Sequence, residues 1–454
     1  MRIREALDIH RGDVVAFIGA GGKSSTLFRL GRELAAEGWR VIGTTTTRVS
    51  ADELLLAPGA LNITGAVLRP EAISRALGQH SFVFLYHGIL GEKAIGLSPD
   101  TIDALIDAVD SDVILVEADG ARRLPFKAPH PHEPVIPAAA TLVVPVVGID
   151  AVGQPLDAEH VYNPEAMIAR YGYPHGERVK WPWIASVLRD PDLGLKGAPE
   201  HARLVALINK VPVSGLHRNL ARLIARLALR EPRLSAAAVG AMQDDDPISE
   251  LHRRVGAVVL AAGLSRRMNQ PGQSKVLLPW DGRPIIRVIV DRLKRMRLDD
   301  LVVVTGHLAT RVRAALADEP VRFSHNPDYK QGDMLSSLQT GLRTLGPEIA
   351  ACLVVLGDQP QLDNRVVAEL ITTYAEGRGK IVAPSYQQRR GHPILIDRSF
   401  WSEILSLPED GSPRDVINAH ADQIAYVPVE TDSVLRDIDT PDDYRQARRQ
   451  AGLT

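Results

Sequence analysis

The sequence predicts an α/β protein of two domains, the first of them built on a doubly wound parallel sheet. Short apolar runs of strand length alternate with amphipathic helical stretches, a pattern typical of sheets covered by helices. An apolar strand runs into a glycine-rich turn twice, at residues 14–26 and 256–278. The polar stretch 242–254 between these segments is predicted to be a linker, so we expect domains at residues 1–248 and 254–454.

Composition excludes several classes of protein. The formal net charge is -2 and 24% of residues are charged, whereas nucleic-acid binders are usually clearly basic. The single cysteine, Cys352, excludes an internal disulfide and lies in an apolar run, where we expect an inert buried thiol. The N-terminal stretch is charged and lacks an apolar core, so we expect no secretory signal, and no apolar run in the sequence is long enough to span a bilayer. We therefore expect a cytoplasmic protein without nucleic-acid or membrane partners.

A phosphate-binding loop is predicted near the N-terminus. The strand Val14 to Ile18 runs into Gly21, Gly22, Lys23 and Ser24 and then into a helix, the order in which phosphate-binding loops are built. The spacing departs from the standard loop, because that loop has a glycine five residues before Gly22 and this chain has phenylalanine there. We expect ATP or GTP at these four residues; a plain helix-capping turn is the alternative.

The other strands predicted in the first half end in polar residues. Four threonines, 44–47, follow one strand, and Glu117 and Asp119 follow another; such acidic residues suit Mg²⁺ beside a nucleotide, or cap a turn. The proline-rich stretch 122–135 is predicted to be a ligand-binding loop, with metal binding by His130, His132 and Glu133 or a plain connection as alternatives. Further strands are expected at 41–43, 82–86, 142–147 and 204–208, and a helix at 216–229.

The second glycine-rich turn follows the apolar strand 257–261. Leu260, Ala261, Ala262 and Gly263 end this strand, small residues that let a backbone approach a polyphosphate closely. Ser265, Arg266 and Lys275 follow, and the two cations suit the charge of a triphosphate. The alternative is an ordinary strand-to-loop turn with a solvated arginine pair.

The rest of the second half continues the alternation of strands and helices. Strands are expected at 301–305, 322–325, 351–356, 381–383 and 394–396, and helices at 284–297, 312–316 and from 441 onward. Asp358 follows a buried strand and Asp439 precedes the final helix; each binds a ligand or caps its turn. Ser336 and Ser337 stand at a helix start, where either role is open.

Taken together, these motifs resemble the MobA-like nucleotidyltransferases. The motifs are LAAGLSRRM with Lys275, then GDQP, RGHP and DIDTPDD, and the resemblance covers residues 254–448. It is nearest to the molybdenum cofactor cytidylyltransferases, which implies a Rossmann-like nucleotidyltransferase domain. It also implies transfer of CMP from CTP to molybdenum-loaded molybdopterin, giving molybdopterin cytosine dinucleotide and pyrophosphate. Guanylyl-transferring relatives tend to read LAGG where this chain reads LAAG, which favours cytosine. Family loops read Arg-Met-Gly before the lysine, and Asn269 replaces that glycine here.

The resemblance assigns roles to individual residues. Mg²⁺ would be held by Asp358 and Asp439, Arg266 would hold the β- and γ-phosphates, and Lys275 would stabilise charge on the α-phosphate. Lys275, Arg266 and Asp358 are thus the expected catalytic residues. His392 would lie in the pterin-side pocket, although a structural loop is equally expected there.

The first half, through GAGGKSST, TTTT, EADGARRLPFKAP and HEPVIP, resembles the YqeC-like family over residues 8–240. That family is associated with maturation of selenium-dependent molybdenum hydroxylases and has no established reaction, so the resemblance implies a nucleotide site and a molybdenum hydroxylase or its chaperone as partner. Two alternatives stay open for the whole chain. One is a GTP-dependent molybdopterin guanylyltransferase or a sugar-phosphate nucleotidyltransferase; the other is a carrier or chaperone of the molybdenum cofactor.

Overall fold

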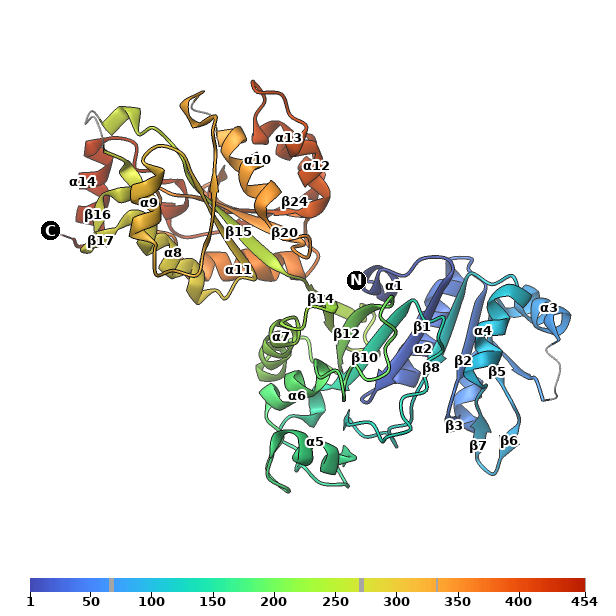
Figure 1. Cartoon of the computed structure of the whole chain (residues 1–454). Helices are drawn as coiled ribbons and strands as arrows, with labels where there is room; N and C mark the ends of the chain where they lie inside the picture. Colours follow the sequence, from blue (N-terminus) through green and yellow to red (C-terminus); the bar gives the residue numbers. More distant parts are fainter. Residues whose placement is uncertain (65–68, 269–272, 332–333, 454) are drawn as a thin grey trace. The chain divides into compact units, whose positions relative to one another are not determined.

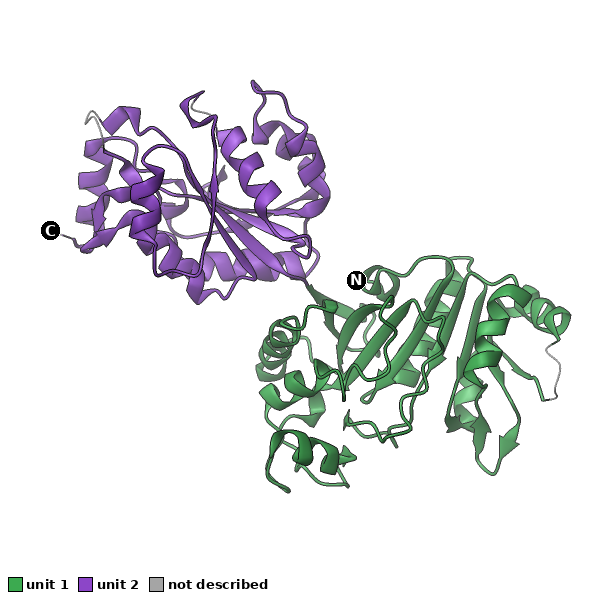
Figure 2. Ribbon diagram, in the orientation of Figure 1, with its two compact units in different colours: residues 1–252 green, residues 253–454 purple. Residues whose placement is uncertain are grey.

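The computed structural model describes residues 1–64, 69–268, 273–331 and 334–453. Asn269, where the sequence departs from the family loop, lies outside these ranges. The chain divides into two compact units, Met1–His252 and Arg253–Thr454, coloured separately in Figure 2. Among the described residues, no helix is both long and apolar enough to cross a membrane.

Unit 1 is built on a sheet whose neighbouring strands are parallel, except at the β13–β14 edge (Figure 1). In spatial order its strands are β14 (Ile248–His252), β13 (Leu234–Gly240), β12 (Arg203–Asn209), β10 (Leu142–Gly148), β1 (Asp13–Gly19), β8 (Val113–Glu117), β2 (Val41–Thr45), β5 (Phe82–Tyr86) and β4 (Gly59–Asn62). The central parallel strands are apolar and buried, because helices cover both faces of the sheet.

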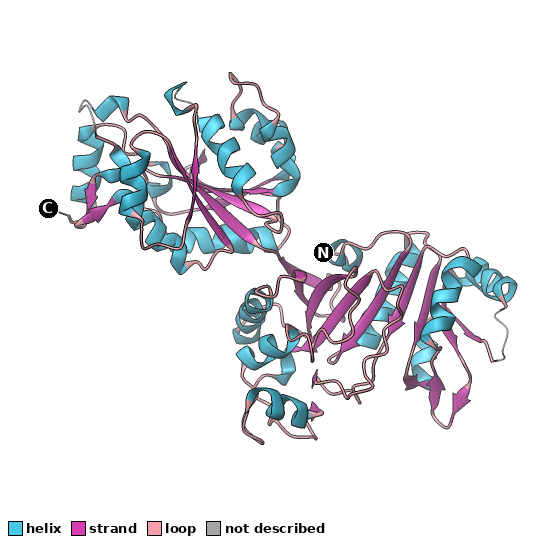
Figure 3. Ribbon diagram, in the orientation of Figure 1, coloured by secondary structure: helices cyan, strands magenta, loops and turns pink. Residues whose placement is uncertain are grey.

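Side-chain alternation along β1 divides the core of unit 1 into two layers. Ala16 and Ile18 pack into one hydrophobic cluster, while Val15 and Phe17 pack into the other. The helices that contribute to the first cluster are α3 (Pro70–His80), α4 (Pro99–Ala108), α5 (Pro164–Tyr171), α6 (Trp181–Leu188) and α7 (Leu216–Ala228). Those of the second are α1 (Ile3–Leu7) and α2 (Lys23–Ala36). Strands between two helical layers are visible in Figure 3.

Two small sheets flank the carboxyl ends of the main strands of unit 1. One consists of β3 (Arg48–Ser50), β7 (Lys93–Ile95) and β6 (Ile89–Leu90), and the other of β9 (Phe126–Lys127) and β11 (Val161–Tyr162). The first extends the segment after β2, and the second holds part of the predicted ligand-binding loop. Both therefore border the place where the predicted phosphate loop lies.

Unit 2 has a mixed sheet. In spatial order its strands are β19 (Arg322–His325), β18 (Asp300–Thr305), β15 (Val255–Ala261), β20 (Ala351–Leu356), β23 (Ile394–Asp397), β21 (Ile381–Tyr386) and β22 (Arg389–Arg390), with β24 (Ile424–Pro428) paired to β21. The pairs of β15 with β18 and β20 are parallel, whereas β23 is antiparallel to its neighbours. A short hairpin, β16 (Pro279–Trp280) with β17 (Arg283–Pro284), follows the second glycine-rich turn.

Helices again cover both faces. Val259 of β15 faces α8 (Ile285–Arg295), α9 (Ala309–Ala315), α11 (Asn364–Ala375) and α14 (Pro441–Gln450). Its neighbour Val258 faces α10 (Met334–Thr344), α12 (Trp401–Leu405) and α13 (Pro413–Ala419). Helix α14 begins with a capping box of Thr440 and Asp443. Cys352 lies fully buried in β20, and burial raises the pKa of its thiol, as expected of an inert side chain.

Each strand that the sequence predicts is present, but several further strands and helices carry no clear signal in the sequence. The expected linker 242–254 includes β14, so the first unit extends to His252 rather than ending at 248. Ile248, Leu251 and His252 are buried against the first unit. Their burial depends on pairing with β13, a tertiary contact that the polar composition of this stretch conceals.

A buried carboxylate explains why such a polar strand belongs to the sheet. The side chain of Glu250 is 0% exposed and accepts hydrogen bonds from Arg218 at 2.7 Å, Arg222 at 2.7 Å and His252 at 2.9 Å. Burial by itself raises the pKa of Glu250, but these hydrogen bonds and charges outweigh it and hold the pKa well below its ordinary value. The network ties β14 to α7.

The variant Glu250→Gln is expected to lower the free energy of unfolding of the full chain by about 3 kcal/mol at pH 7, because it leaves two arginines without their buried counter-charge. Because the folded-state pKa of Glu250 is depressed, its stabilisation is present above the unfolded-state pKa of about 4.3 and is lost as pH falls below that value. Urea denaturation at pH 7 and pH 4 should therefore show a smaller difference between variant and wild type at pH 4. A difference that is equal at both pH values would contradict this account.

Candidate functional site

The turn after β15 and the turn after β20 emerge side by side from the sheet of unit 2. In the parallel ladder Leu260 lies opposite Leu356, so the segments that follow them, with Gly263 and Asp358, leave the same edge. The close approach requires glycine at 357, because a Cβ there would lie 2.5 Å from the carbonyl oxygen of Leu260. Backbone geometry thus brings two sequence-distant segments to one place.

Lys275 joins these segments. Its Nζ forms an ion pair with Asp358 and lies 2.8 Å from Oδ1 of Asp439, just before α14. The backbone N–H of Lys275 donates to Oγ of Ser265 at 3.0 Å, and Ser265 has a left-handed backbone with φ of 52°. Arg267 approaches the other oxygen of Asp439 at 2.5 Å. The structure therefore brings together the lysine and both carboxylates that the sequence motifs single out.

The two carboxylates, Asp358 and Asp439, differ in burial, and their pKa values shift in opposite directions. Burial raises the pKa of Asp358 above its ordinary value, although Lys275 opposes that shift. The hydrogen bond from Lys275 instead holds the pKa of Asp439 below its ordinary value. A desolvated carboxylate such as Asp358 needs a cation close by, and the ammonium group of the lysine provides it.

A cavity of about 390 Å³ opens above this group. The cavity is lined by most of the site residues predicted in unit 2: Leu260, Ala261, Ala262, Gly263, Ser265, Arg266, Lys275, Asp358 and Asp439. The guanidinium of Arg266 is exposed and donates to the backbone oxygen of Lys330 at 2.9 Å, so it stands at the rim of the cavity.

His392 does not line this cavity. Its backbone N–H donates to the backbone oxygen of Val434 at 2.9 Å, and burial lowers the pKa of its imidazole to about 4. The ring is therefore neutral at pH 7. This position fits the structural-loop alternative for RGHP at least as well as a contact with substrate.

Further polar residues of unit 2 support the site. Gln359 donates to Asp437 at 2.6 Å, which ties the GDQP turn to the segment before α14. The buried amide of Asn326 lies 3.0 Å from Oγ of both Ser336 and Ser337, and Ser337 lines the cavity. The two serines, for which the sequence left ligand binding and helix capping open, therefore meet this asparagine.

The donor set fits a magnesium ion of the kind that nucleotides bring with them. Asp358 and Asp439 both contact one atom, Nζ of Lys275, so their oxygens face a common point. Among the described residues, no group of three or more acidic, histidine or cysteine side chains forms a complete metal cage. Mg²⁺ typically takes one or two carboxylates and completes its shell with phosphate oxygens and water, so two carboxylates beside a phosphate-sized cavity suffice.

In unit 1, the turn after β1 passes very close to β10. Gly19 has φ of 90° and Gly21 has φ of 83°, and a Cβ on either would collide with the β10 backbone at Val146 or Gly148. The backbone N–H groups of Gly19 and Gly21 donate to Asp119 and Leu124, at 3.0 and 3.1 Å. These two N–H groups are thus not free to bind an anion, which would instead meet the N–H groups of the first turn of α2. The loop therefore offers fewer backbone donors than a standard phosphate-binding loop.

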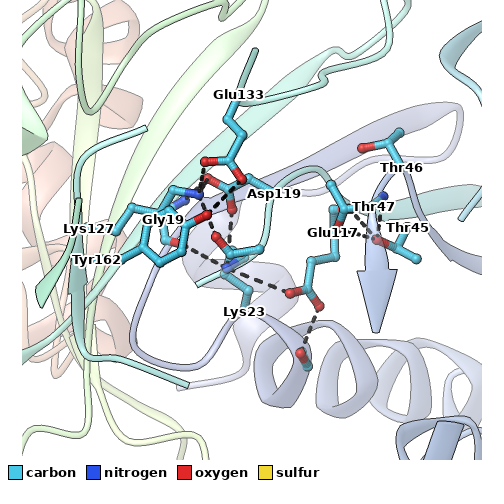
Figure 4. A network of polar contacts seen from close by, with 12 residues as sticks. Gly19, Lys23, Thr45, Thr46, Thr47, Glu117, Asp119, Lys127, Glu133 and Tyr162 are labelled. Atoms are coloured by element: carbon cyan, nitrogen blue, oxygen red, sulfur yellow. Dashed lines mark hydrogen bonds and ion pairs between the residues drawn. The ribbon is translucent and has the colours of Figure 1, made fainter. Parts of the chain in front are cut away.

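Lys23 lies beneath that turn, as Figure 4 shows. Its Nζ donates to the backbone oxygen of Gly19 at 2.7 Å and lies 3.2 Å from Asp119 and 3.6 Å from Glu117. Burial lowers the pKa of Lys23, but the charges of Asp119 and Glu117 outweigh it and the net shift is upward. For the acid Glu117, burial has the opposite effect and raises the pKa. Its Oε2 accepts a hydrogen bond from Ser24 at 2.7 Å.

A second buried lysine continues the network. Nζ of Lys127 lies 3.0 Å from Asp119 and 2.9 Å from Glu133, and donates to Gly120 at 2.5 Å (Figure 4). Glu133 is thus paired with an ammonium group, and among the described residues it does not form, with His130 and His132, a group of three side chains that could hold a metal. The rings of His130 and His132 stack at 5.8 Å. No local pattern in the sequence singles out Lys127.

Two polar motifs of unit 1 have structural partners. Thr45 donates to the backbone oxygen of Glu117 at 2.8 Å and Thr46 to that of Val135 at 2.8 Å, so the threonine run ties the end of β2 to the end of β8 and to the proline-rich loop. Asn209 donates to Gly21 at 2.9 Å and fixes the glycine turn from the side of β12. Above these contacts lies a cavity of about 960 Å³, whose lining includes Gly21, Gly22, Lys23 and Ser24.

These features define the class of the protein: two α/β units, the second of the nucleotidyltransferase class. The family model described as MobA-like NTP transferase domain matches residues 257–424, and the model described as YqeC protein matches residues 15–165. The chain belongs to the YqeC family through its first unit and is a fusion of a YqeC domain with a MobA-like NTP transferase domain.

Three curated relatives place the two halves. The uncharacterized protein YqeC of Escherichia coli is 32% identical over 202 residues, which cover 44% of this chain and 77% of the relative. The molybdenum cofactor cytidylyltransferase of Escherichia coli is 27% identical over 197 residues, which cover 43% of this chain and 96% of the relative. Nicotine blue oxidoreductase of Paenarthrobacter nicotinovorans is 28% identical over 197 residues, covering 41% and 92% respectively. Because these last two relatives have different names at similar identity, likeness alone does not fix the reaction.

Proposed function

We propose that unit 2 transfers CMP from CTP to the terminal phosphate of molybdenum-loaded molybdopterin, giving molybdopterin cytosine dinucleotide and pyrophosphate. The observation that carries this proposal is the convergence of Lys275, Asp358 and Asp439 beside a cavity bordered by the Ala-Ala-Gly turn. The relationship to a molybdenum cofactor cytidylyltransferase supports the choice of acceptor and base. The charged lining suits a phosphorylated substrate.

The chemistry joins two anions, so neutralising their charge is the main requirement. An oxygen of the acceptor phosphate forms a bond to the α-phosphorus of CTP, the bond from that phosphorus to the bridging oxygen of the β-phosphate breaks, and pyrophosphate leaves. Lys275 supplies a fixed positive charge at the α-phosphate, and Arg266 at the rim offers a donor to the β- and γ-phosphates. Neither residue has to form a covalent intermediate.

Asp358 and Asp439 are the residues that would hold Mg²⁺. The ion supplies further neutralisation of the phosphate oxygens when bound. The ion pair with Arg267 and the hydrogen bond of Asp437 with Gln359 orient the segment that carries Asp439. The site is therefore set in place by contacts that do not themselves reach the reacting atoms.

The alternatives differ in what they require of these residues. A guanylyltransferase or a sugar-phosphate nucleotidyltransferase needs the same cations and carboxylates but another base or acceptor. A carrier of the molybdenum cofactor needs the cavity and its cations but no pair of metal-holding carboxylates. The paired carboxylates at Lys275 favour the transferase over the carrier.

We further propose that unit 1 binds ATP or GTP with Mg²⁺ at the first turn of α2. Ser24 and Glu117 share a hydrogen bond of 2.7 Å, and Lys23 lies beneath the turn, so a hydroxyl, a carboxylate and an ammonium group stand at one helix start within a cavity. Fusion of the two units suggests that both serve one cofactor pathway, with a molybdenum hydroxylase or its chaperone as recipient, in a cytoplasmic protein.

The full chain, supplied with Mg²⁺ and molybdenum-loaded molybdopterin, is expected to release pyrophosphate at least about tenfold faster with CTP than with GTP, a ratio typical of modest differences in base contacts. A coupled pyrophosphate assay with each nucleotide measures this. Faster release of pyrophosphate with GTP would identify GTP as the donor. No release with any nucleotide would refute the transferase proposal.

Asp358→Asn is expected to lower kcat/KM for this reaction at least about 100-fold. It removes one of the two carboxylates proposed to hold the Mg²⁺ that neutralises the phosphate oxygens. Asp410→Asn, an exposed aspartate of the same unit, is the matched control and should stay within about twofold of wild type. Equal activity of Asp358→Asn and wild type would contradict the role that we assign to this carboxylate.

Ser24→Ala and Lys23→Ala are each expected to weaken binding of a non-hydrolysable ATP or GTP analogue to unit 1 at least about tenfold, through loss of one charge-assisted contact. Calorimetry is run on the full chain with unit 2 first saturated by a CTP analogue. Lys23→Ala also uncovers two buried carboxylates, so Ser24→Ala provides the reading if that variant unfolds. Wild-type affinity in both variants would contradict the proposed site.

A further inference from the structure

The cavity of unit 1 is larger than a nucleotide site alone requires. At about 960 Å³ it is more than twice the 390 Å³ of the cavity that we assign to CTP in unit 2. The first turn of α2 forms only part of its lining. The remainder comes from the segments that follow β2 and β8, from β7, from Tyr162 of β11 and from Lys210 after β12.

The lining is rich in cations whose charge is not neutralised within the protein. Arg48, Lys93, Arg122 and Arg123 all line the cavity, and within the described ranges 1–64 and 69–268 none of them forms an ion pair with an acidic side chain. The acidic side chains of the lining are Glu53, Glu117 and Glu133, and the last two are paired with Lys23 and Lys127. By contrast, Lys23 and Lys210 have acidic partners, Lys210 through Asp150 at 2.8 Å. Like charges gathered around a cavity repel one another, and an anionic ligand removes that repulsion.

The four cations form two groups on different flanks of the α2 start. Arg48 and Lys93 belong to the small sheet β3–β7, next to β2. Arg122 and Arg123 belong to the turn after β8, which crosses towards β10. Two hydrogen bonds fix that crossing: Gly21 N–H to Leu124 at 3.1 Å and Gly148 N–H to Pro125 at 2.9 Å.

The crossing turn presents its arginines through an unusual backbone. Arg122 and Arg123 are consecutive residues with φ of 49° and 63°, in the left-handed region that side-chain-bearing residues rarely adopt. Such conformations persist where the surrounding structure imposes them, often at ligand sites. The guanidinium of Arg122 lies 5.7 Å from the ring centre of Tyr162, which also lines the cavity. Both arginine side chains are otherwise exposed to the cavity and solvent.

We propose that Arg122 and Arg123 form a second subsite in unit 1, which binds a phosphate-bearing small molecule while a nucleoside triphosphate occupies the start of α2. Guanidinium groups suit this role because they present paired donors that match two phosphate oxygens. Unit 1 thus holds two anionic ligands in one cavity, the arrangement that a nucleotide-dependent reaction on a phosphorylated compound requires. The presence of the first ligand rests on the nucleotide site proposed above; the arginine subsite does not.

The test uses the full chain and inorganic phosphate as the probe, observed by phosphorus NMR line broadening. Mg²⁺ and saturating non-hydrolysable analogues of ATP and CTP fill both nucleotide sites first. Phosphate is expected to bind wild type under these conditions, and Arg122→Ser/Arg123→Ser is expected to weaken that binding at least about tenfold, while affinity for the ATP analogue stays within about twofold. Arg75→Ser, an exposed arginine of α3, is the matched control.

The outcomes separate the two proposals. Phosphate binding that the ATP analogue abolishes, or that the double variant leaves unchanged, overturns the second subsite. Loss of affinity for the ATP analogue in the double variant, with phosphate binding intact, also overturns it and assigns the arginines to the nucleotide. If wild type binds no ATP or GTP analogue in unit 1, the nucleotide site fails, and the same phosphate titration on ligand-free protein still tests the arginines. Circular dichroism establishes that both variants are folded.

Discussion

The ion pairs of Lys275 with Asp358 and Asp439 are the interaction on which the site of unit 2 depends. They join a loop after β15, a turn after β20 and the segment before α14, which are remote in the sequence. Parallel strand pairing brings the first two together, and the lysine, with the contacts of Arg267 and Gln359, holds the third beside them. Without a cation at this point, two carboxylates would face each other in a partly desolvated place, which is unfavourable.

Unit 1 solves the same problem in the same way. Lys23 stands between Glu117 and Asp119, as Lys275 stands between Asp358 and Asp439. In both units one of the carboxylates lies at the end of a buried central strand, and the lysine follows the neighbouring strand. The difference is accessibility: the side chain of Lys23 is 3% exposed, whereas that of Lys275 is 18% exposed. The lysine of unit 1 therefore has mainly a supporting position under its glycine turn, while that of unit 2 faces the cavity.

How far the sequence predicts the structure depends on whether a signal is local. Central strands such as β8 and β20 are continuous apolar runs, and the acidic residues that end them follow directly, so Glu117 and Asp358 were recognisable. Strand β14 has Glu250 at its centre and resembles a linker, because the burial of that carboxylate becomes favourable only through Arg218 and Arg222 of α7 and through His252. Lys127 likewise cannot be recognised from the sequence, because its role depends on tertiary contacts. Its partners Asp119 and Glu133 reach it only after the loop folds back.

The buried thiol in β20 has a practical consequence. Cys352 is the only cysteine in the chain, its side chain is fully buried, and it favours the protonated form, which is a poor nucleophile. Maleimide reagents should therefore leave the native protein unmodified. Cysteines introduced at the surface, one in each unit, would accept a pair of fluorophores or spin labels without prior removal of the natural one, so the distance between the labels can be followed by spectroscopy.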